Sequence, residues 1–418
     1  MSAANKLVPR LRFPEFRDAG NWDRFNGNKL FAQINDRNHN GELPVLAITQ
    51  EHGAIPRDLI DYNVSVMQSS IDSYKIVREG DFIISLRSFQ GGIEFSNYEG
   101  LCSPAYVILR EKRDTDAHFF KHLFKSKHFI CELTKNLEGL RDGKMISYKQ
   151  FSEVLINLPS KPEQQKIADC LGSLDDRIAA EGRKLAALRE HKKGLMQQFF
   201  PIESETKPHL RFPEFRDAGE WKASRLAKQV ASLDAGVSAL SGDRPALDDE
   251  FGVLKTSCVT DGTFRPEENK VVSAADQLSR VSEPVQADTI IMSRMNTVDL
   301  VGANAYVERA EPNLFLPDRL WAVKANSDGN MRFLSYVLGS VAGRQMLSSL
   351  AKGSSGSMKN IKKSEVLGLE FAVPEPAEQQ RIADCLSALD GLITAQREQI
   401  ATLKEHKKGL MQKLFPYS

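Results

Sequence analysis

Two copies of one segment decide the fold of this chain: Glu163-Gln-Gln-Lys-Ile-Ala-Asp-Cys-Leu171 and Glu378-Gln-Gln-Arg-Ile-Ala-Asp-Cys-Leu386. Each copy opens a stretch of about 38 residues without internal proline, long enough for an extended helix. In both stretches apolar residues recur in alternating steps of four and three, which is typical of a coiled coil. The predicted seam consists of Ile167, Leu171, Leu174, Ile178, Leu185, Leu188 and Leu195 in the first copy, and of Ile382, Leu386, Leu389, Ile393, Ile400, Leu403 and Leu410 in the second.

Polar residues interrupt the seam at the same two places in both copies, Glu181 and Gln396 at one place and Lys192 and Lys407 at the other. Such residues lower the stability of a coiled coil but fix its register. Because a globular domain separates the two helices, the chain must leave one end and return to it, which favours an antiparallel pair within one molecule. A parallel pair between two molecules is the alternative. Each helix would form a rod of roughly 57 Å at 1.5 Å per residue.

Two further repeated segments indicate that the whole chain is a duplication. Leu11-Arg-Phe-Pro-Glu-Phe-Arg-Asp-Ala-Gly20 recurs from Leu210 to Gly219, and Glu190-His-Lys-Lys-Gly-Leu-Met-Gln197 recurs from Glu405 to Gln412. The repeating unit of about 200 residues is far longer than a solenoid repeat and indicates a duplicated domain. We expect Leu11 to Phe16 and its copy to pack between domain and helix.

Between the repeated segments the halves diverge, since residues 25–158 and 222–373 share only a faint outline. A near-identical scaffold beside unlike inserts indicates that the scaffold meets the same kind of partner twice, whereas the inserts meet different ligands. Helices are expected from Phe119 onward and from Phe333 to Leu350. Short apolar runs between Gly, Pro and Asn predict strands at 45–50, 81–86, 105–110, 252–257, 289–293, 303–307 and 320–324.

These patterns predict an α+β protein in which a long antiparallel two-helix coiled coil separates two mixed α/β domains, with a pseudo-two-fold internal repeat. The predicted segments are an entry segment with the first domain at 1–158, a central spacer helix at 159–201, a second entry segment and domain at 202–373, and a C-terminal spacer helix at 374–418.

The composition bounds the class of protein. The chain has 418 residues, of which 41% are hydrophobic and 27% charged, as in ordinary soluble globular proteins. No apolar run approaches the roughly 20 residues of a membrane helix, and the start has no apolar core typical of a secretory signal. The five cysteines form no Cys-x-x-Cys pair and no Cys/His cluster, which favours free thiols in the cytoplasm and no metal site.

The net charge of +1 requires that any nucleic-acid surface be local. Gly329 to Ser364 contains no acidic residue, and His118 to Lys135 contains only Glu132. The sequence has no Walker-type glycine loop, adenine methyltransferase motif, His-Glu-x-x-His or Gly-x-Ser-x-Gly elbow. We therefore expect no catalytic residue and no cofactor in this chain.

The Leu-Arg-Phe-Pro-Glu-Phe entry, the Glu-Gln-Gln helix start that follows Pro159 and Pro374, and the alternation of variable insert with repeated helix resemble the DNA-specificity subunit of Type I restriction-modification enzymes. This resemblance covers essentially the whole chain. It implies that each variable region is a target recognition domain for one half of a bipartite, asymmetric site on double-stranded DNA. It implies that the helices act as a spacer and bind two modification subunits, which carry S-adenosylmethionine and methylate adenine. A separate restriction subunit, driven by ATP with Mg, would translocate and cut the DNA.

Base edges in the major groove are read by Arg, Lys, Asn, Gln and Ser, whereas phosphate contacts set position. Loop residues that follow strands are therefore the candidate readers, and Arg87 and Arg294 are the strongest because they occupy corresponding places. The candidates are Arg87, Ser88, Gln90, Lys144, Ser147 and Tyr148 in the first domain, and Arg294, Asn296, Ser354, Ser355, Lys359 and Asn360 in the second.

Half-sites read from one face of B-DNA lie about one turn apart, roughly 34–36 Å, which predicts two half-sites of about three to five base pairs around roughly six unread ones. The alternative function is a coiled-coil scaffold or adaptor whose two variable domains bind proteins. Salt-sensitive binding to duplex DNA distinguishes the two functions. An enzyme with an unrecognised site is a third class, and turnover by the isolated chain would reveal it.

Overall fold

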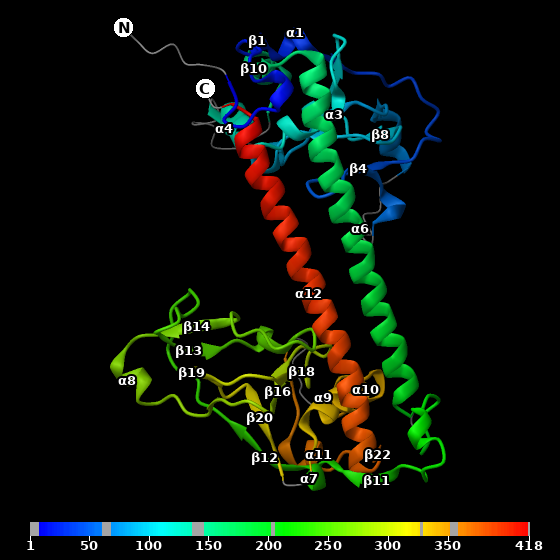
Figure 1. Cartoon of the computed structure of the whole chain (residues 1–418), viewed down its shortest axis with the longest axis vertical. Coiled ribbons are helices and arrows are strands. Elements are labelled where there is room, and N and C mark those ends of the chain that lie inside the picture. Colours follow the sequence, from blue (N-terminus) through cyan, green and yellow to red (C-terminus); the bar gives the residue numbers. More distant parts are fainter. Residues whose placement is uncertain are drawn as a thin grey trace. The chain divides into compact units, whose positions relative to one another are not determined.

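Two long helices, α6 (Lys161–Phe199) and α12 (Pro376–Leu414), are the central elements of the computed structural model (Figure 1). The structure describes residues 8–60, 68–135, 146–201, 205–326, 329–351 and 358–416. The chain divides into two compact units, Met1–Arg183 with Arg397–Ser418, and Lys184–Gln396. Both boundaries fall within the long helices, so each unit contains the first part of one helix and the last part of the other.

Within each unit the two helix segments run antiparallel. In the first unit Leu171, near the start of α6, shares an apolar cluster with Leu414 at the end of α12. In the second unit Leu386, near the start of α12, shares a cluster with Phe199 at the end of α6. The predicted antiparallel pairing within one molecule is therefore confirmed. All the predicted seam residues are buried or half-buried, whereas the intervening positions are mostly exposed.

Both units contain the same four-stranded antiparallel sheet although their sequences diverge. The order is β2-β9-β6-β7 in the first unit and β12-β20-β16-β18 in the second. The strands are β2 (Phe31–Ile34), β6 (Phe82–Ile84), β7 (Glu94–Phe95) and β9 (Val107–Glu111), and β12 (Val230–Ala235), β16 (Thr289–Ser293), β18 (Asn304–Val307) and β20 (Leu320–Ala325). These strands confirm most of the apolar runs that the sequence predicts.

A pair of short helices accompanies each sheet, α3 (Ala117–Leu123) with α4 (Lys127–Thr134), and α9 (Met331–Gly339) with α10 (Val341–Ser349). The prediction of one continuous helix from Phe333 to Leu350 is therefore wrong in one respect. The helix breaks at Ser340, whose hydroxyl accepts the backbone N–H of Gly343 at 3.1 Å and so caps α10. Ser126 caps α4 in the same way.

A two-stranded ribbon closes each insert where it joins the scaffold. β1 (Asp23–Asn26) pairs with β10 (Leu155–Leu158), and β11 (Lys222–Arg225) pairs with β22 (Glu370–Val373). The remaining elements of the first unit are α1 (Gly27–Leu30), β3 (Leu46–Thr49), β4 (Gly53–Pro56), β5 (Lys75–Val77), α2 (Ser88–Gly91), β8 (Gly100–Cys102) and α5 (Tyr148–Glu153). Those of the second are α7 (Leu226–Gln229), β13 (Phe251–Leu254), β14 (Asn269–Val272), α8 (Ala275–Leu278), β15 (Pro284–Val285), β17 (Met295–Asn296), β19 (Glu311–Phe315), β21 (Lys359–Asn360) and α11 (Lys363–Leu367).

The repeated entry segments pack where predicted, between domain and helix. The backbone N–H of Leu11 donates to the carbonyl of Lys413 at the end of α12, and the N–H of Leu210 donates to the carbonyl of Gln198 at the end of α6. Arg12 binds the carboxylate of Glu163 near the start of α6, and Arg211 binds the carboxylate of Glu378 near the start of α12. Each entry segment therefore joins the start of one long helix to the end of the other.

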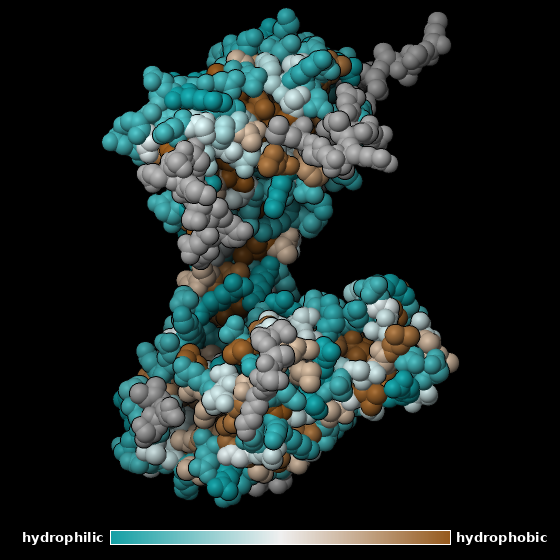
Figure 2. All heavy atoms as spheres, turned by 180° about the vertical axis from the view of Figure 1, so that it is seen from behind, coloured by the Kyte–Doolittle hydropathy of each residue, from teal (hydrophilic) through white to brown (hydrophobic). Residues whose placement is uncertain are grey.

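All five cysteines are free. No helix in the described part of the chain is both long and apolar enough to cross a membrane. Figure 2 shows that hydrophilic residues cover much of the face of each unit seen there, with apolar residues scattered among them.

Candidate nucleic-acid interface

A two-stranded ribbon brings four predicted readers of the second unit together. β17 pairs antiparallel with β21, so that Asn296 lies opposite Lys359 and Met295 opposite Asn360. Arg294 directly precedes β17, and its carbonyl accepts the backbone N–H of Ile361 at 3.1 Å. Residues far apart in the sequence thus form one surface, which we call the β17–β21 ribbon and which follows strand β16 of the central sheet.

The β17–β21 ribbon carries polar groups whose hydrogen-bonding capacity is not filled. The guanidinium of Arg294 lies 5.7 Å from the ring centre of Trp321, which holds it from one side. Its Nε and the Oδ1 of Asn360 are buried and have no hydrogen-bond partner among the described residues. Since buried polar groups in native proteins are nearly always paired, these two atoms mark a place where a bound water or a ligand would supply the missing partner. Arg and Asn are also the side chains that read guanine and adenine most often.

One basic residue beside this ribbon was missed in the sequence. Arg319 is exposed, and its carbonyl accepts the backbone N–H of Arg294 at 3.0 Å. The contact arises because β16 pairs with β20, which places Ser293 opposite Leu320. The sequence showed only that a basic residue directly precedes a predicted strand. That Arg319 lies beside Arg294 follows from the order of the strands in the sheet.

In the first unit the equivalent strand end carries Arg87 and Gln90, both exposed. Gln90 lies in the short helix α2 and Arg87 directly precedes it, and α2 follows β6 as the β17–β21 ribbon follows β16. Gln50, another exposed residue, donates from its side-chain amide to the carbonyl of Arg87 at 3.4 Å. Gln50 was not among the predicted readers, because it comes from the distant end of β3.

Three predicted readers of the first unit have structural roles. Ser88 is 1% exposed, and its hydroxyl accepts the backbone N–H of Ser85 at 2.9 Å. Ser147 forms a capping box with Gln150 at the start of α5. The Tyr148 hydroxyl donates to the carbonyl of Phe31 at 3.0 Å while its ring packs on the core. Burial contradicts the prediction for Ser88, because serine is as common in buried turns as at binding surfaces, whereas Ser147 and Tyr148 are half-buried and remain predicted readers. The predicted readers Lys144, Ser354 and Ser355 lie outside the described residues.

One residue of each basic stretch is engaged inside the protein. Arg344 donates to the carbonyls of Asp299 and Val301, and burial lowers the pKa of its guanidinium. In the first unit Lys125 pairs with the buried Glu94 at 2.5 Å, and burial still raises the pKa of that carboxyl. Arg344 and Lys125 are therefore poor candidates for contact with DNA, and the polar residues at the ends of β6 and β16 are better ones.

Among the described residues no group of three or more His, Cys, Asp and Glu side chains is placed to hold a metal ion. The polar groups at the ends of β6 and β16 offer hydrogen-bond donors and acceptors. They suit recognition of a polar ligand, and the two sets differ in residue type between the units.

Two topologically equal sheets, each with a different polar set at the same strand end and each built on an antiparallel pair of helix segments, define a duplicated two-domain recognition protein. The comparisons with known proteins agree. The family model for the Type I restriction modification DNA specificity domain matches residues 22–190 and 277–405, and the chain belongs to this family.

The relatives and solved structures extend this finding. The MjaVIII specificity subunit of Methanocaldococcus jannaschii is 25% identical over 362 residues, which cover 80% of this chain and 78% of that protein. The EcoEI specificity subunit of Escherichia coli is 23% identical over 64% of this chain and 41% of its own length. The crystal structure of a Type I restriction-modification S subunit from M. genitalium shares the fold, with a TM-score of 0.58 at 14% identity over 98% of this chain and 99% of that one. A chain from a study of complex assembly and conformational transition of the Type I system has a TM-score of 0.52 at 18% identity, over 94% and 97% of the two chains.

Proposed function

We propose that this chain is the non-catalytic specificity subunit of a Type I restriction-modification complex, and that its two variable domains each read one half of a bipartite, asymmetric DNA site. The observation that carries this proposal is the placement of Arg87 and Arg294. They follow equivalent strands, β6 and β16, of two sheets with the same topology. One scaffold thus presents an arginine at the same place twice, beside different neighbours, as two unlike half-sites require.

The repeated helix ends support two identical partners, which we propose are modification subunits. Near the end of each helix an exposed lysine lies beside an exposed glutamate, Lys193 with Glu190 and Lys408 with Glu405. The side-chain exposures are 62% and 75% in the first pair and 64% and 74% in the second. Exposed residues need not be alike for folding, so their identity in both copies indicates that each copy binds the same partner.

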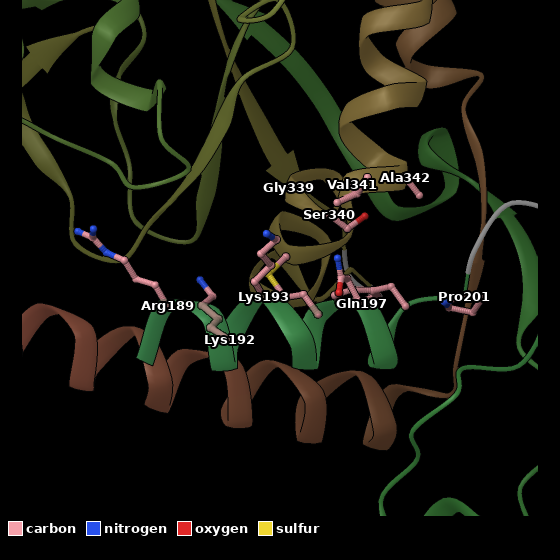
Figure 3. A pocket seen from close by; sticks show the side chains of 11 residues that line it. Arg189, Lys192, Lys193, Gln197, Pro201, Gly339, Ser340, Val341 and Ala342 are labelled. Carbon is pink, nitrogen blue, oxygen red and sulfur yellow. The ribbon is translucent and has the colours of Figure 1, made fainter. Parts of the chain in front are cut away.

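A pocket of about 460 Å³ adjoins the first of these helix ends (Figure 3). Arg189 and Lys193 of α6 lie on one side, and Ser340, Val341 and Ala342 from the corner between α9 and α10 lie on the other. The exposed Val341 supplies apolar area and the α6 residues supply positive charge. Such a surface suits a protein partner with apolar and acidic side chains.

In this proposal S-adenosylmethionine, ATP and Mg are bound by the modification and restriction subunits, and the complex acts in the cytoplasm. The adaptor alternative is less well supported, because it gives no reason for matched arginines at equivalent strand ends. Binding of the assembled complex to duplex DNA should weaken steeply as salt is raised, since contacts to phosphates release counterions.

Sequencing of methylated adenines in cells that carry this chain with its modification subunits tests the proposal. We expect one bipartite motif, with half-sites of about three to five base pairs separated by roughly six unread ones. Arg294→Ala should relax one half-site, and Arg87→Ala should relax the other, each by about 1–3 kcal/mol of discrimination. A single contiguous motif, or loss of both half-sites in either variant, would contradict the proposal.

A further inference from the structure

The two lysines that interrupt the helix seam, Lys192 and Lys407, form ion pairs between the two long helices. In the second unit the Nζ atom of Lys192 on α6 lies 2.6 Å and 2.8 Å from the two carboxylate oxygens of Asp390 on α12. In the first unit the Nζ atom of Lys407 on α12 lies 2.5 Å from Asp175 on α6. The two pairs are equivalent under the internal repeat. Each joins a lysine near the end of one helix to an aspartate near the start of the other.

In the second unit a residue of the recognition domain joins the pair. The hydroxyl of Tyr336 on α9 donates to Oδ2 of Asp390 at 2.7 Å, and the ammonium of Lys192 lies 5.0 Å from the centre of the tyrosine ring. Tyr336 is only 9% exposed. Lys192, Asp390 and Tyr336 therefore link α6, α12 and the domain in one polar cluster, which we call the latch.

The first unit has the same arrangement with a different third residue. Phe119 packs on Trp22 with ring centres 6.0 Å apart, and Phe333 packs on Trp221 at 6.2 Å, so these phenylalanines are equivalent. Three residues further on, His122 takes the place of Tyr336. Its Nδ1 lies 3.9 Å from Asp175, beyond hydrogen-bond distance. The domain of the first unit is thus not hydrogen-bonded to its ion pair through this position.

Apolar seams alone do not fix position well. The hydrophobic effect has no direction, and a heptad pattern fits again after a shift of one repeat. The latch has direction, because its half-buried charges are paired only when three elements meet in one arrangement. A shift of any element would break these directed contacts, and the ammonium of Lys192, whose side chain is 21% exposed, would lose its carboxylate partner.

We propose that Lys192, Asp390 and Tyr336 are positioning residues that hold the second recognition domain at one height and one rotation on the helix pair, and so restrict the accepted length of the unread DNA spacer. This inference rests on the proposed function. A spacer that is one base pair longer moves a half-site by about 3.4 Å and turns it by roughly 35°, so a firmly held domain rejects it. The first domain, without the tyrosine, depends on apolar packing for the same purpose.

Two measurements on the full chain test the proposal. Hydrogen exchange of the free chain reports how firmly α9 is held, without DNA or partners. Methylation of plasmids whose spacer varies by one or two base pairs around the native length, by the chain assembled with its modification subunits, reports spacer tolerance. The variants are Tyr336→Phe, which removes one hydroxyl, and Lys192→Met, which removes the charge and keeps most of the apolar stem.

Both variants should speed exchange across α9 and raise methylation at altered spacers, relative to the native spacer, about tenfold, the factor expected for 1.4 kcal/mol. Both should leave the sequence of each half-site unchanged. Lys184→Met, which removes a charge from an exposed position of α6, should match the wild type in both measurements. His122→Phe should have a smaller effect than Tyr336→Phe on spacer tolerance.

Unchanged exchange in α9 for both variants would overturn the proposal, as would faster exchange with unchanged spacer tolerance, since the latch would then serve only stability. If the wild-type complex methylates no bipartite site, the proposed function fails, whatever the exchange data show. The two failures are therefore distinguishable.

Discussion

One buried ion pair recurs in both units and connects the entry segment to a long helix. Arg12 binds both carboxylate oxygens of Glu163 at 2.7 Å, with side-chain exposures of 7% and 1%. Hydrogen bonding to Glu163 raises the pKa of Arg12. Such a bidentate pair is directional, and it becomes costly when one partner is removed, because the other charge stays buried.

Arg12→Met should therefore lower the free energy of unfolding of the first unit by about 3–5 kcal/mol. Arg211→Met, which leaves Glu378 unpaired in the second unit, should cost more. Trp22 Nε1 also donates to Glu163 at 3.3 Å, whereas Trp221 Nε1 has no partner among the described residues. Urea unfolding of each variant measures both effects.

A double variant is the control for this prediction. Arg12→Met combined with Glu163→Met removes both charges and should recover most of the loss, because the penalty arises from the unpaired carboxylate. If the single substitution costs less than about 1 kcal/mol, the pair behaves as a surface ion pair and the argument is wrong.

His122 makes the stability of the first unit sensitive to acid. Burial, followed by the positive charges of Lys407, Lys121 and His118, lowers its pKa to about 3. In the unfolded chain the imidazole takes up a proton below about pH 6.5, whereas in the folded chain it does so only near pH 3. The unfolded state therefore binds more protons between these values, and stability falls as the pH is lowered through this window.

His122→Phe removes this titration. The difference in the free energy of unfolding between pH 7 and pH 5 should shrink by about 2 kcal/mol relative to the wild type. Urea unfolding at the two pH values measures this difference. An equal pH dependence in variant and wild type would show that His122 is not the group that titrates.

At the scale of elements, the corner between two short helices recurs in both units and depends on a serine. Ser340 caps α10 and Ser126 caps α4, each by accepting a backbone N–H from three residues further on. Ser340→Ala and Ser126→Ala should each lower the free energy of unfolding by about 1 kcal/mol. Replacement by Asp, which can also cap a helix, should restore most of it. Thermal or urea unfolding reads the effect, and an alanine variant as stable as wild type would refute the role of the cap.

Elements with a local signal were predictable from the sequence. The heptads of α6 and α12 and the apolar run at Thr289–Ser293 carry their own periodicity, and the structure confirms them. The β17–β21 ribbon has no such signal, because each strand has two residues and its partner is remote. The latch was predictable in part. The seam lysines stood out as polar interruptions, but Tyr336 reaches Asp390 only through the packing of α9.

At the scale of the whole molecule, the duplication separates residues that must stay alike from residues that are free to vary. Glu163 and Glu378 belong to the repeated scaffold, and each makes the same bidentate pair with its arginine in both units. The inserts keep the order of four strands but differ in almost every side chain. Function by two unlike readers therefore requires change only in the inserts.

The ribbon that closes the second insert makes it exchangeable. Lys222 lies opposite Val373 in the antiparallel pair of β11 and β22, so the two ends of the insert meet at one point of the scaffold. Replacement of residues 222–373 by the corresponding insert of another family member leaves the Arg211–Glu378 pair in place. We expect such a chimera to keep one half-site of the methylated motif and to change the other. Sequencing of methylated adenines measures both halves at once. If both half-sites change, the two inserts do not read DNA independently. If neither changes, the second insert does not read DNA at all.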